Sequence, residues 1–308
     1  METPTQQIPV TVPKLVLNQS QIVLRGFWHS VWRRLRRDRA AVVGAALVGL
    51  IIFVAIFAPL LTPYDPITQY PDGLTERGQP LSSTGKFILG TDKWGRDLFT
   101  RIIYGARTTL LIGALGSLLA VALGVIFGSI AGYIGGWVET IIMRFTDAML
   151  AIPNLLLAMA LASILRPSVA IVIVVIAIAN WTYVARIVYG ETLSLKQQDF
   201  ILAAYSLGVP RMRILIRHLL PHLVSIIVVY TTLGISSAIL LEAALGYLGL
   251  GVPPPTPTWG TMISEGQNAY LFAPWLVLYP GLAILLTVLG FNLFGDGLRD
   301  AVDPQQWR

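Results

Sequence analysis

The sequence predicts an all-α integral membrane protein with six transmembrane helices and with both termini on the cytoplasmic side. Hydrophobic residues make up 55% of the chain and charged residues only 12%, whereas a soluble domain carries about a quarter charged side chains. Long charge-free runs match the length that a helix needs to cross a hydrocarbon core of about 30 Å. Lysine and arginine also concentrate on alternate connecting segments, as in membrane proteins of defined orientation.

Seven charge-free runs contain 18 or more residues, and six of them predict spans. The run at 243–264 is excluded because it contains Pro253, Pro254, Pro255 and Pro257, and proline leaves helix carbonyls unsatisfied in lipid. The predicted spans are residues 40–61, 108–132, 149–166, 169–189, 222–246 and 274–294.

The distribution of lysine and arginine predicts the orientation of these spans. With a cytoplasmic N-terminus, 15 of the 22 basic residues lie on the inner side, counting Arg186 at the end of the fourth span, and 7 lie outside. The strongest determinant is the run of five arginines at 33–39, directly before the first span. We therefore expect a multi-pass protein of the cytoplasmic (inner) membrane, in contact with the lipid bilayer.

The spans divide the chain into five regions. Residues 1–39 are predicted to be a cytoplasmic tail and an amphipathic interface helix, 40–61 the first span, 62–107 an extracytoplasmic loop, 108–294 the core and 295–308 a cytoplasmic tail. Within these regions, 27–39 fits a helix on the membrane surface or a simple orienting flank. The end of the loop, 95–107, has amphipathic helical spacing.

Small residues and hydroxyl groups mark the faces of two predicted spans. Gly124, Gly128 and Gly132 repeat every four residues, a spacing that favours close helix packing over a role in a transport path. Ser225, Thr232 and Ser236 share one face of the fifth span, where they fit either the lining of a polar path or hydrogen bonds between helices.

Two acidic residues lie within or beside the spans. Asp147 begins the third span and suits the positive end of that helix. Glu242 lies toward the outer end of the fifth span, where snorkelling, packing and substrate contact all remain open.

Motifs for catalysis and for cofactor or metal binding are absent from the sequence. The chain has no G-x-x-x-x-G-K-[ST] loop, no H-E-x-x-H, no G-x-S-x-G and no cysteine. His218 and His222 are four residues apart, but Pro221 interrupts the turn between them and no acidic ligand accompanies them. We expect no catalytic, cofactor-binding or metal-binding residue. The net charge of +6 arises at the ends of the spans, which favours lipid over nucleic acid.

The inner loop at 196–221 has the pattern of a docking element. Residues 199–207 predict a helix, Gly208 ends it, and Pro210 begins a second helix that runs to Pro221 with three arginines. Small residues at Ala203 and Ala204 would let this helix enter a groove on another protein, although a helix lying on the membrane surface has the same pattern.

These residues resemble the EAA loop of ABC-importer permeases. The match consists of Ala203-Ala204, Gly208 and His218-Leu219-Leu220-Pro221, with departures at Leu202, Tyr205 and His222. Leu202 replaces the glutamate, a change common in the peptide-importer branch. Four further segments, at 89–108, 132–153, 242–262 and 291–304, are similar to the C-type permease of dipeptide, oligopeptide and glutathione importers.

The resemblance implies a type I ABC-importer permease fold and a non-catalytic subunit. It further implies a homologous B-type permease as partner, two ABC ATPase subunits that bind ATP and Mg, and an extracytoplasmic substrate-binding protein that meets the outer loops. Coupling to the ATPases is expected at Asp199, Ala203, Ala204, Gly208, Arg211, Leu220 and Pro221. Asp296, Arg299 and Asp300 are candidates for further ATPase contacts, or for local pairing at the end of the sixth span.

Two other functions compete with this interpretation. A stand-alone secondary carrier predicts internal repeats and ion-coupling carboxylates at mid-membrane, and an intramembrane enzyme predicts clustered nucleophiles, metal ligands or paired acids. The sequence has clear evidence of neither pattern. The resemblance leaves dipeptides, longer peptides, glutathione and nickel complexes as candidate substrates.

Overall fold

The computed structural model describes residues 29–302, which form an elongated bundle of helices. The predicted tail at 1–26 and the chain from 303 onward lie outside the described residues. Among the described residues, β-type pairing is limited to two isolated bridges, Leu74 with Pro80 and Thr91 with Asp97. The elements are α2 (Arg39–Ile56), α3 (Ala58–Leu61), α4 (Leu98–Ile134), α5 (Gly136–Leu150), α6 (Asn154–Ile164), α7 (Val169–Lys196), α8 (Asp199–Ser206), α9 (Arg211–Ile214), a π-turn (Leu215–Leu219), α10 (Leu220–Tyr247), α11 (Trp259–Gly266), a 3-10 turn (Gln267–Ala269) and α12 (Trp275–Val302).

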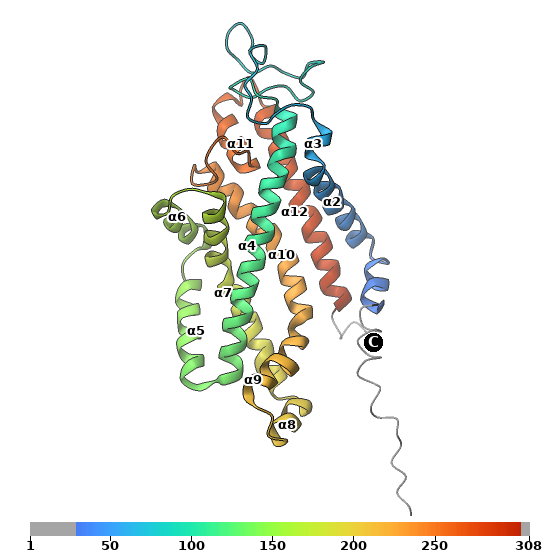
Figure 1. The fold of residues 1–308 in the computed structure, drawn as a ribbon, viewed down its shortest axis with the longest axis vertical. Helices are drawn as coiled ribbons and strands as arrows, with labels where there is room; N and C mark the ends of the chain where they lie inside the picture. The colour runs from blue at the N-terminus through green and yellow to red at the C-terminus, as the bar shows by residue number, and fades with distance from the viewer. Residues whose placement is uncertain (1–28, 303–308) are drawn as a thin grey trace, which may run out of the picture.

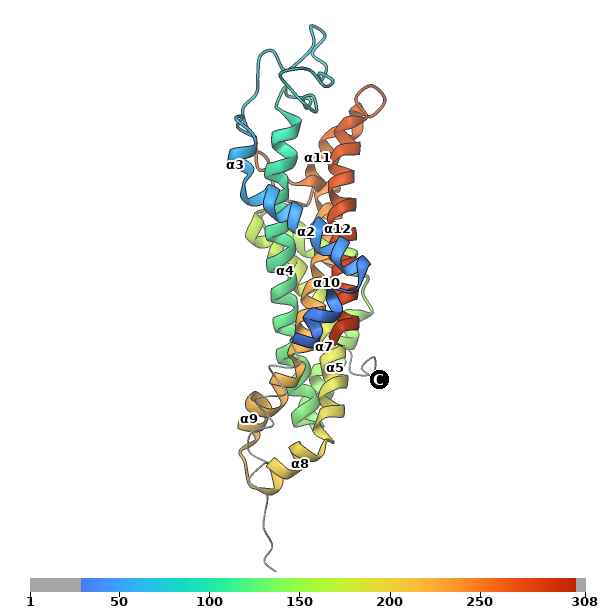
Figure 2. The ribbon, with the colours of Figure 1, turned by 90° about the vertical axis from the view of Figure 1, so that its right-hand side faces the viewer.

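The two ends of the bundle differ in character (Figure 1). One end, here the loop end, carries the irregular segment 62–97 and α11. The other, here the α8 end, carries α8 and α9, which project beyond the long helices in both views (Figures 1 and 2). Both boundaries of the described chain, at residues 29 and 302, lie toward the α8 end.

Within residues 29–302, five helices are long and apolar enough to cross a membrane: α2, α4, α7, the continuous helix 211–247, and α12. A sixth crossing exists if the bent pair α5 and α6 forms one span. The predicted third span at 149–166 is therefore a broken element rather than a single helix. Its two halves meet at an angle of 91°, because Pro153 at the N-cap of α6 cannot continue the hydrogen-bond ladder of α5.

The helices α4 and α7 pack closely over much of their length, and glycine makes this possible. A Cβ atom added at Gly124 would lie 2.6 Å from Val184 Cβ, and one at Gly128 would lie 2.5 Å from the Ala185 carbonyl oxygen. At Gly132 the same atom would meet Thr192 Cβ at 2.8 Å. The prediction that this stripe serves helix packing is confirmed, and the partner is α7 of the same chain.

Two helices extend beyond their predicted ends. The segment 95–107 is not a separate helix, because α4 begins at Leu98 and runs for 37 residues. Asp97 caps it by accepting a hydrogen bond from the Thr100 backbone nitrogen at 2.8 Å. A helix of this length spans about 55 Å, which exceeds an apolar layer of about 30 Å. The amphipathic spacing belongs to the part of α4 that extends beyond such a layer.

The helix that begins after Pro210 does not stop at Pro221. It continues through the π-turn into α10, so that residues 211–247 form one helical rod. Proline removes one backbone donor and its ring crowds the carbonyl one turn earlier. The π-turn directly before Pro221 widens the helix at that point and accommodates the ring without ending the helix.

The predicted amphipathic segment at 27–39 is helical over residues 29–35 in the described part of the chain. Val31 and Leu35 are buried against Leu298 and Val302 of α12, whereas Trp32 is exposed. Asp38 then caps α2 by accepting a hydrogen bond from the Ala40 backbone nitrogen at 2.9 Å. This segment therefore packs on the bundle with one face.

Gly128→Ala should destabilise the bundle by about 1–3 kcal/mol, because the added methyl group overlaps the α7 backbone. Thermal unfolding of the purified chain in detergent measures the effect. Gly49→Ala is the matched control, since a Cβ at Gly49 meets nothing within 4 Å. Equal melting temperatures for the two variants would show that α4 and α7 tolerate separation.

Candidate functional site

The helix α8 forms a short corner at one end of the bundle, and its tip is set by Gly208. The Gly208 backbone nitrogen donates to the Tyr205 carbonyl oxygen at 3.0 Å, and Val209 donates to Ala204 at 3.2 Å. This pair of bonds is a Schellman motif, which requires a left-handed residue after the helix. Gly208 supplies it with φ of +72°. The predicted role of Gly208 in ending the helix is confirmed.

One side of α8 anchors it to the long helices. Ile201 and Ala204 are buried in a cluster with Ile214, Leu215 and Leu219 from the following helical rod. The ring of Phe200 also stacks on His222 with 4.8 Å between ring centroids. The helix α8 is therefore packed firmly against the beginning of α10.

The other side of α8 is apolar and uncovered. Leu202 is 53% exposed and Leu207 83% exposed, and Ala203 between them is exposed as well. Two apolar residues of the adjoining rod, Met212 and Ile216, extend this surface. Exposed apolar area of this kind marks a contact with another protein or with lipid.

The seven residues predicted for coupling lie along this corner. Asp199 begins α8, Ala204 is its buried anchor, and Gly208 turns the chain. Arg211 begins the second helix and is exposed, while the half-buried Leu220 and the exposed Pro221 open α10. Arg211 also borders a groove of about 620 Å³ beside α8, which it shares with Lys196, Tyr133 and Tyr205.

A cavity of about 820 Å³ opens in the middle of the bundle, where α5 bends into α6. Its wall combines apolar residues with seven polar ones: Ser117, Asn154, Asn180, Tyr183, Tyr230, Ser237 and Arg299. Asn154 donates a hydrogen bond to Asn180 at 2.9 Å across the bend, and Tyr183 meets Tyr230 edge-on with 6.1 Å between ring centroids. Hydroxyl and amide groups thus line this cavity in an otherwise apolar bundle.

The three hydroxyl residues predicted as a lining lie outside this wall. Ser236 is buried and donates to the Val288 carbonyl oxygen of α12 at 3.5 Å, and Thr232 donates to Val228 within its own helix at 2.9 Å. Ser225 is half-buried. The wall instead uses the neighbouring face of α10, which carries Tyr230 and Ser237. In the sequence, this face can be identified because the residues of α10 that line the cavity recur at intervals of three and four.

The predicted tail residues separate in the structure. All three are exposed on the last turns of α12, but only Arg299 borders the cavity. Asp300 borders a second hollow that also includes Arg34 and Asp38 at the start of α2. The three residues therefore do not form one surface.

Two acidic residues within the bundle occupy different surroundings. Glu242 is fully buried in α10 with Thr109 and Thr258 as polar neighbours, so snorkelling does not describe it. Asp147 of α5 forms an ion pair with Arg186 of α7, and both side chains are substantially exposed.

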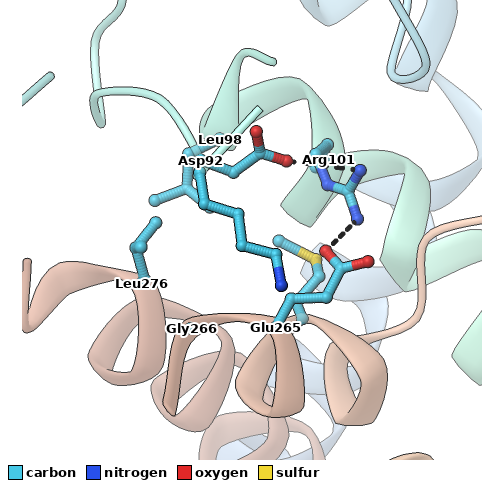
Figure 3. Close-up of a pocket in the computed structure, with 8 residues that line it drawn as sticks. Asp92, Leu98, Arg101, Glu265, Gly266 and Leu276 are labelled. Carbon is cyan, nitrogen blue, oxygen red and sulfur yellow. Dashed lines mark hydrogen bonds and ion pairs between the residues drawn. The ribbon is translucent and has the colours of Figure 1, made fainter. Parts of the chain in front are cut away.

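Four alternating charges hold the loop end together, and Figure 3 shows three of them, with Arg101 between Asp92 and Glu265. Arg96 donates to Asp92 at 2.6 Å and to Glu265 at 3.0 Å. Arg101 of α4 donates to Glu265 of α11 at 2.8 Å and lies 3.4 Å from Asp92. All four side chains are mostly buried, at 16% exposure or less. This ion-pair cluster joins the end of the irregular segment, α4 and α11.

Hydrogen bonds fold the irregular segment 62–97 onto this cluster. Asp92 accepts bonds from the backbone nitrogens of Trp94 at 2.9 Å and Arg96 at 3.0 Å, which shapes its own turn. The Thr91 hydroxyl joins two distant parts of the segment. It accepts a hydrogen bond from the Leu81 backbone nitrogen at 2.9 Å and donates one to the Gly73 carbonyl oxygen. The segment is long but ordered by specific contacts, as a binding surface requires.

The comparisons with known proteins cover nearly the whole chain. Residues 124–308 match the model for binding-protein-dependent transport system inner membrane components, and residues 26–80 match the N-terminal TM domain of oligopeptide transport permease C. The dipeptide transport system permease protein DppC of Alkalihalophilus pseudofirmus is 44% identical over 90% of each chain. The glutathione transport system permease protein GsiD of Escherichia coli O157:H7 is 44% identical over 94% of this chain and 96% of its own.

The chain belongs to the binding-protein-dependent transport system inner membrane component family. It is therefore a C-type permease subunit of an ABC importer, and its resemblance to this family is confirmed. The permease is not an enzyme, because ATP hydrolysis belongs to separate ATPase subunits. Within this family the α8 corner is the candidate coupling site, and the central cavity is the candidate path.

Glu265→Gln should destabilise the permease by about 3 kcal/mol, because it removes one charge from a buried cluster and leaves Arg96 and Arg101 facing a single carboxylate. Glutamine preserves the shape, so thermal unfolding in detergent isolates the charge. Asp72→Asn is the control: the ion pair of Asp72 with Lys86 is solvent-exposed, and its loss should change little. Unfolding of Glu265→Gln at the wild-type temperature would contradict a structural role for the cluster.

Proposed function

We propose that this permease forms half of a pathway that imports short peptides or glutathione, driven by ATP hydrolysis in partner subunits. The observation that carries the proposal is the 44% identity, over nine-tenths of the chain or more, to permeases named for dipeptide and glutathione transport. The central cavity supports it, since its hydroxyl and amide groups suit a polar substrate.

The proposed orientation places the α8 end in the cytoplasm. Six spans, with α5 and α6 counted as one, bring both termini to that side, in agreement with 15 of 22 basic residues on the inner segments. The loop end then faces outward in the cytoplasmic membrane. There the segment 62–97 and the chain around α11 offer an ordered surface to a substrate-binding protein.

A second permease of B type completes the assembly in this proposal. The cavity is lined by one chain and remains open to the surroundings, so a homologous subunit facing it would close the path. Two ABC ATPase subunits bind ATP and Mg and dock at the α8 end. No nucleotide-binding motif is present in the sequence of the permease itself.

Coupling in this proposal runs through the α8 corner. The exposed apolar side around Ala203 enters a groove on an ATPase, while the buried side around Ala204 transmits its movement to the helical rod. Asp199, Gly208, Arg211, Leu220 and Pro221 position the two halves of the corner. Closure of the ATPases on ATP then turns the pathway outward, and hydrolysis resets it. Asp296 and Asp300 remain candidates for an additional contact.

The proposed pathway lining is the wall of the central cavity, with Asn154, Asn180, Tyr183, Tyr230 and Ser237 as its polar contacts. Ser225 and Thr232 are candidates only where the partner permease or a moved α10 brings them to the path. Ser236 is assigned to helix packing, since it bonds to α12. The bend at Pro153 borders the cavity and is the proposed position of a gate.

Gly208→Pro and Ala203→Trp should each abolish uptake while the protein still inserts, because they break the corner or block its entry into a groove. Uptake and substrate-stimulated ATPase activity of the reconstituted importer measure the effect. Gly208→Asn and Ala203→Ser are conservative controls, since asparagine tolerates the left-handed region and serine is small. Normal uptake by the Gly208→Pro and Ala203→Trp variants would contradict the coupling assignment.

Import by the complete complex tests the substrate class. Proteoliposomes that contain the two permeases, the ATPases and the binding protein should accumulate a labelled dipeptide, tripeptide or glutathione only when ATP is present on the cytoplasmic side. A nickel complex serves as the competing ligand. Accumulation of nickel alone, or accumulation without ATP, would overturn the proposed function.

A further inference from the structure

Arg299 is the one charged side chain among the residues that line the central cavity. It lies in the last turn of α12, at the α8 end of the wall and close to Tyr230 of α10. The other polar lining groups are hydroxyls and amides, and the lining contains no carboxylate. The wall therefore carries a net positive charge at one end only.

The nearby charges do not cancel this charge within the wall. Asp147 and Arg186, on α5 and α7, form an ion pair with each other and are not lining residues. Asp296 and Asp300 lie on the same turns of α12 but do not line the cavity. Among the described residues that line the cavity, a substrate thus meets one guanidinium group and no carboxylate.

The length of the cavity fits a short peptide. Its face on α10 runs from Tyr230 to Ala244, a distance of about 21 Å at 1.5 Å per residue. An extended tripeptide occupies about 10 Å. At the Tyr230 end of the wall, one turn from Tyr183, Asn180 accepts a hydrogen bond from Asn154, which leaves the Asn154 side-chain carbonyl oxygen as a further acceptor for a substrate.

We propose that Arg299 binds the carboxylate of the substrate at the cytoplasmic end of the pathway and so selects substrates that carry a free carboxylate. Guanidinium and carboxylate match in charge and in geometry, and such a bond is strongest where water is partly excluded. The inference rests on the proposed function, since it requires a peptide or glutathione to pass through this cavity. It assigns a specificity residue to the permease itself, beyond selection by the binding protein.

Two structural roles compete for Arg299. A cation in the last turn of a helix stabilises the helix dipole, and an arginine at the inner end of a span anchors it to lipid phosphates. Both roles predict equal effects on every substrate, because neither involves the ligand. The assignment to the substrate predicts effects that depend on the carboxylate.

The test compares labelled trialanine with labelled trialanine amide, which lacks the terminal carboxylate. Both are supplied to the reconstituted complex at concentrations that saturate the binding protein. Arg299→Gln should lower uptake of trialanine about tenfold relative to wild type, the loss expected for one charge-assisted bond. Its uptake of the amide, relative to wild type, should change less than twofold.

Two variants serve as controls. Arg299→Lys should retain most trialanine uptake. Arg166→Gln, which removes a charge from the connection between α6 and α7, should behave as wild type.

Each other outcome decides against the inference. Equal losses for trialanine and its amide with Arg299→Gln would assign Arg299 to structure or to an ATPase contact, and ATPase activity would separate these two. Unchanged uptake of both would remove any role in transport. Where wild type imports trialanine but not its amide, equal losses with Arg299→Gln and Arg299→Lys would overturn the proposal. Failure of wild type to import either peptide would instead overturn the proposed function, and the inference with it.

Discussion

The close approach of α4 to α7 is the constraint on which the rest of the bundle depends. It exists because Gly124, Gly128 and Gly132 present backbone instead of side chains to α7. In lipid, apolar side chains gain nothing by leaving the solvent, so close van der Waals contact has to supply the attraction between helices. With these two helices fixed, α10 packs across α4, α5 and α6 pack on α7 at either side of their bend, and the central cavity lies between these elements.

Charge is used differently at the two ends of this scaffold. At the loop end, the cluster of Asp92, Arg96, Arg101 and Glu265 is buried, so its bonds fix geometry more than they add stability. Near the middle, the wall of the cavity is polar but nearly uncharged. Buried charge thus fixes the loop end, whereas the cavity wall presents mainly hydroxyl, amide and apolar groups.

The sequence predicted the features that local chemistry determines. Charge-free runs located the long helices, glycine spacing identified the α4 face, and Gly208 located the end of α8. Other features depend on tertiary context. Pro153 breaks its helix whereas Pro221 is absorbed by a π-turn, and the residues themselves do not distinguish these outcomes. Likewise, the sequence predicts that Arg299 belongs to the C-terminal tail. Its position at the cavity follows from the packing of α12 beside α10.

The helical rod from Arg211 to Tyr247 gives the chain a mechanical lever. It is about 55 Å long, and its far end packs on α11, where a Cβ at Gly246 would lie 2.9 Å from the Thr261 backbone nitrogen. A tilt of about 10° at the α8 end would therefore displace the opposite end by about 10 Å. In the proposed coupling, the π-turn lies near the point where an ATPase would act on the rod, and its irregular hydrogen bonding makes it the place where the rod would bend first.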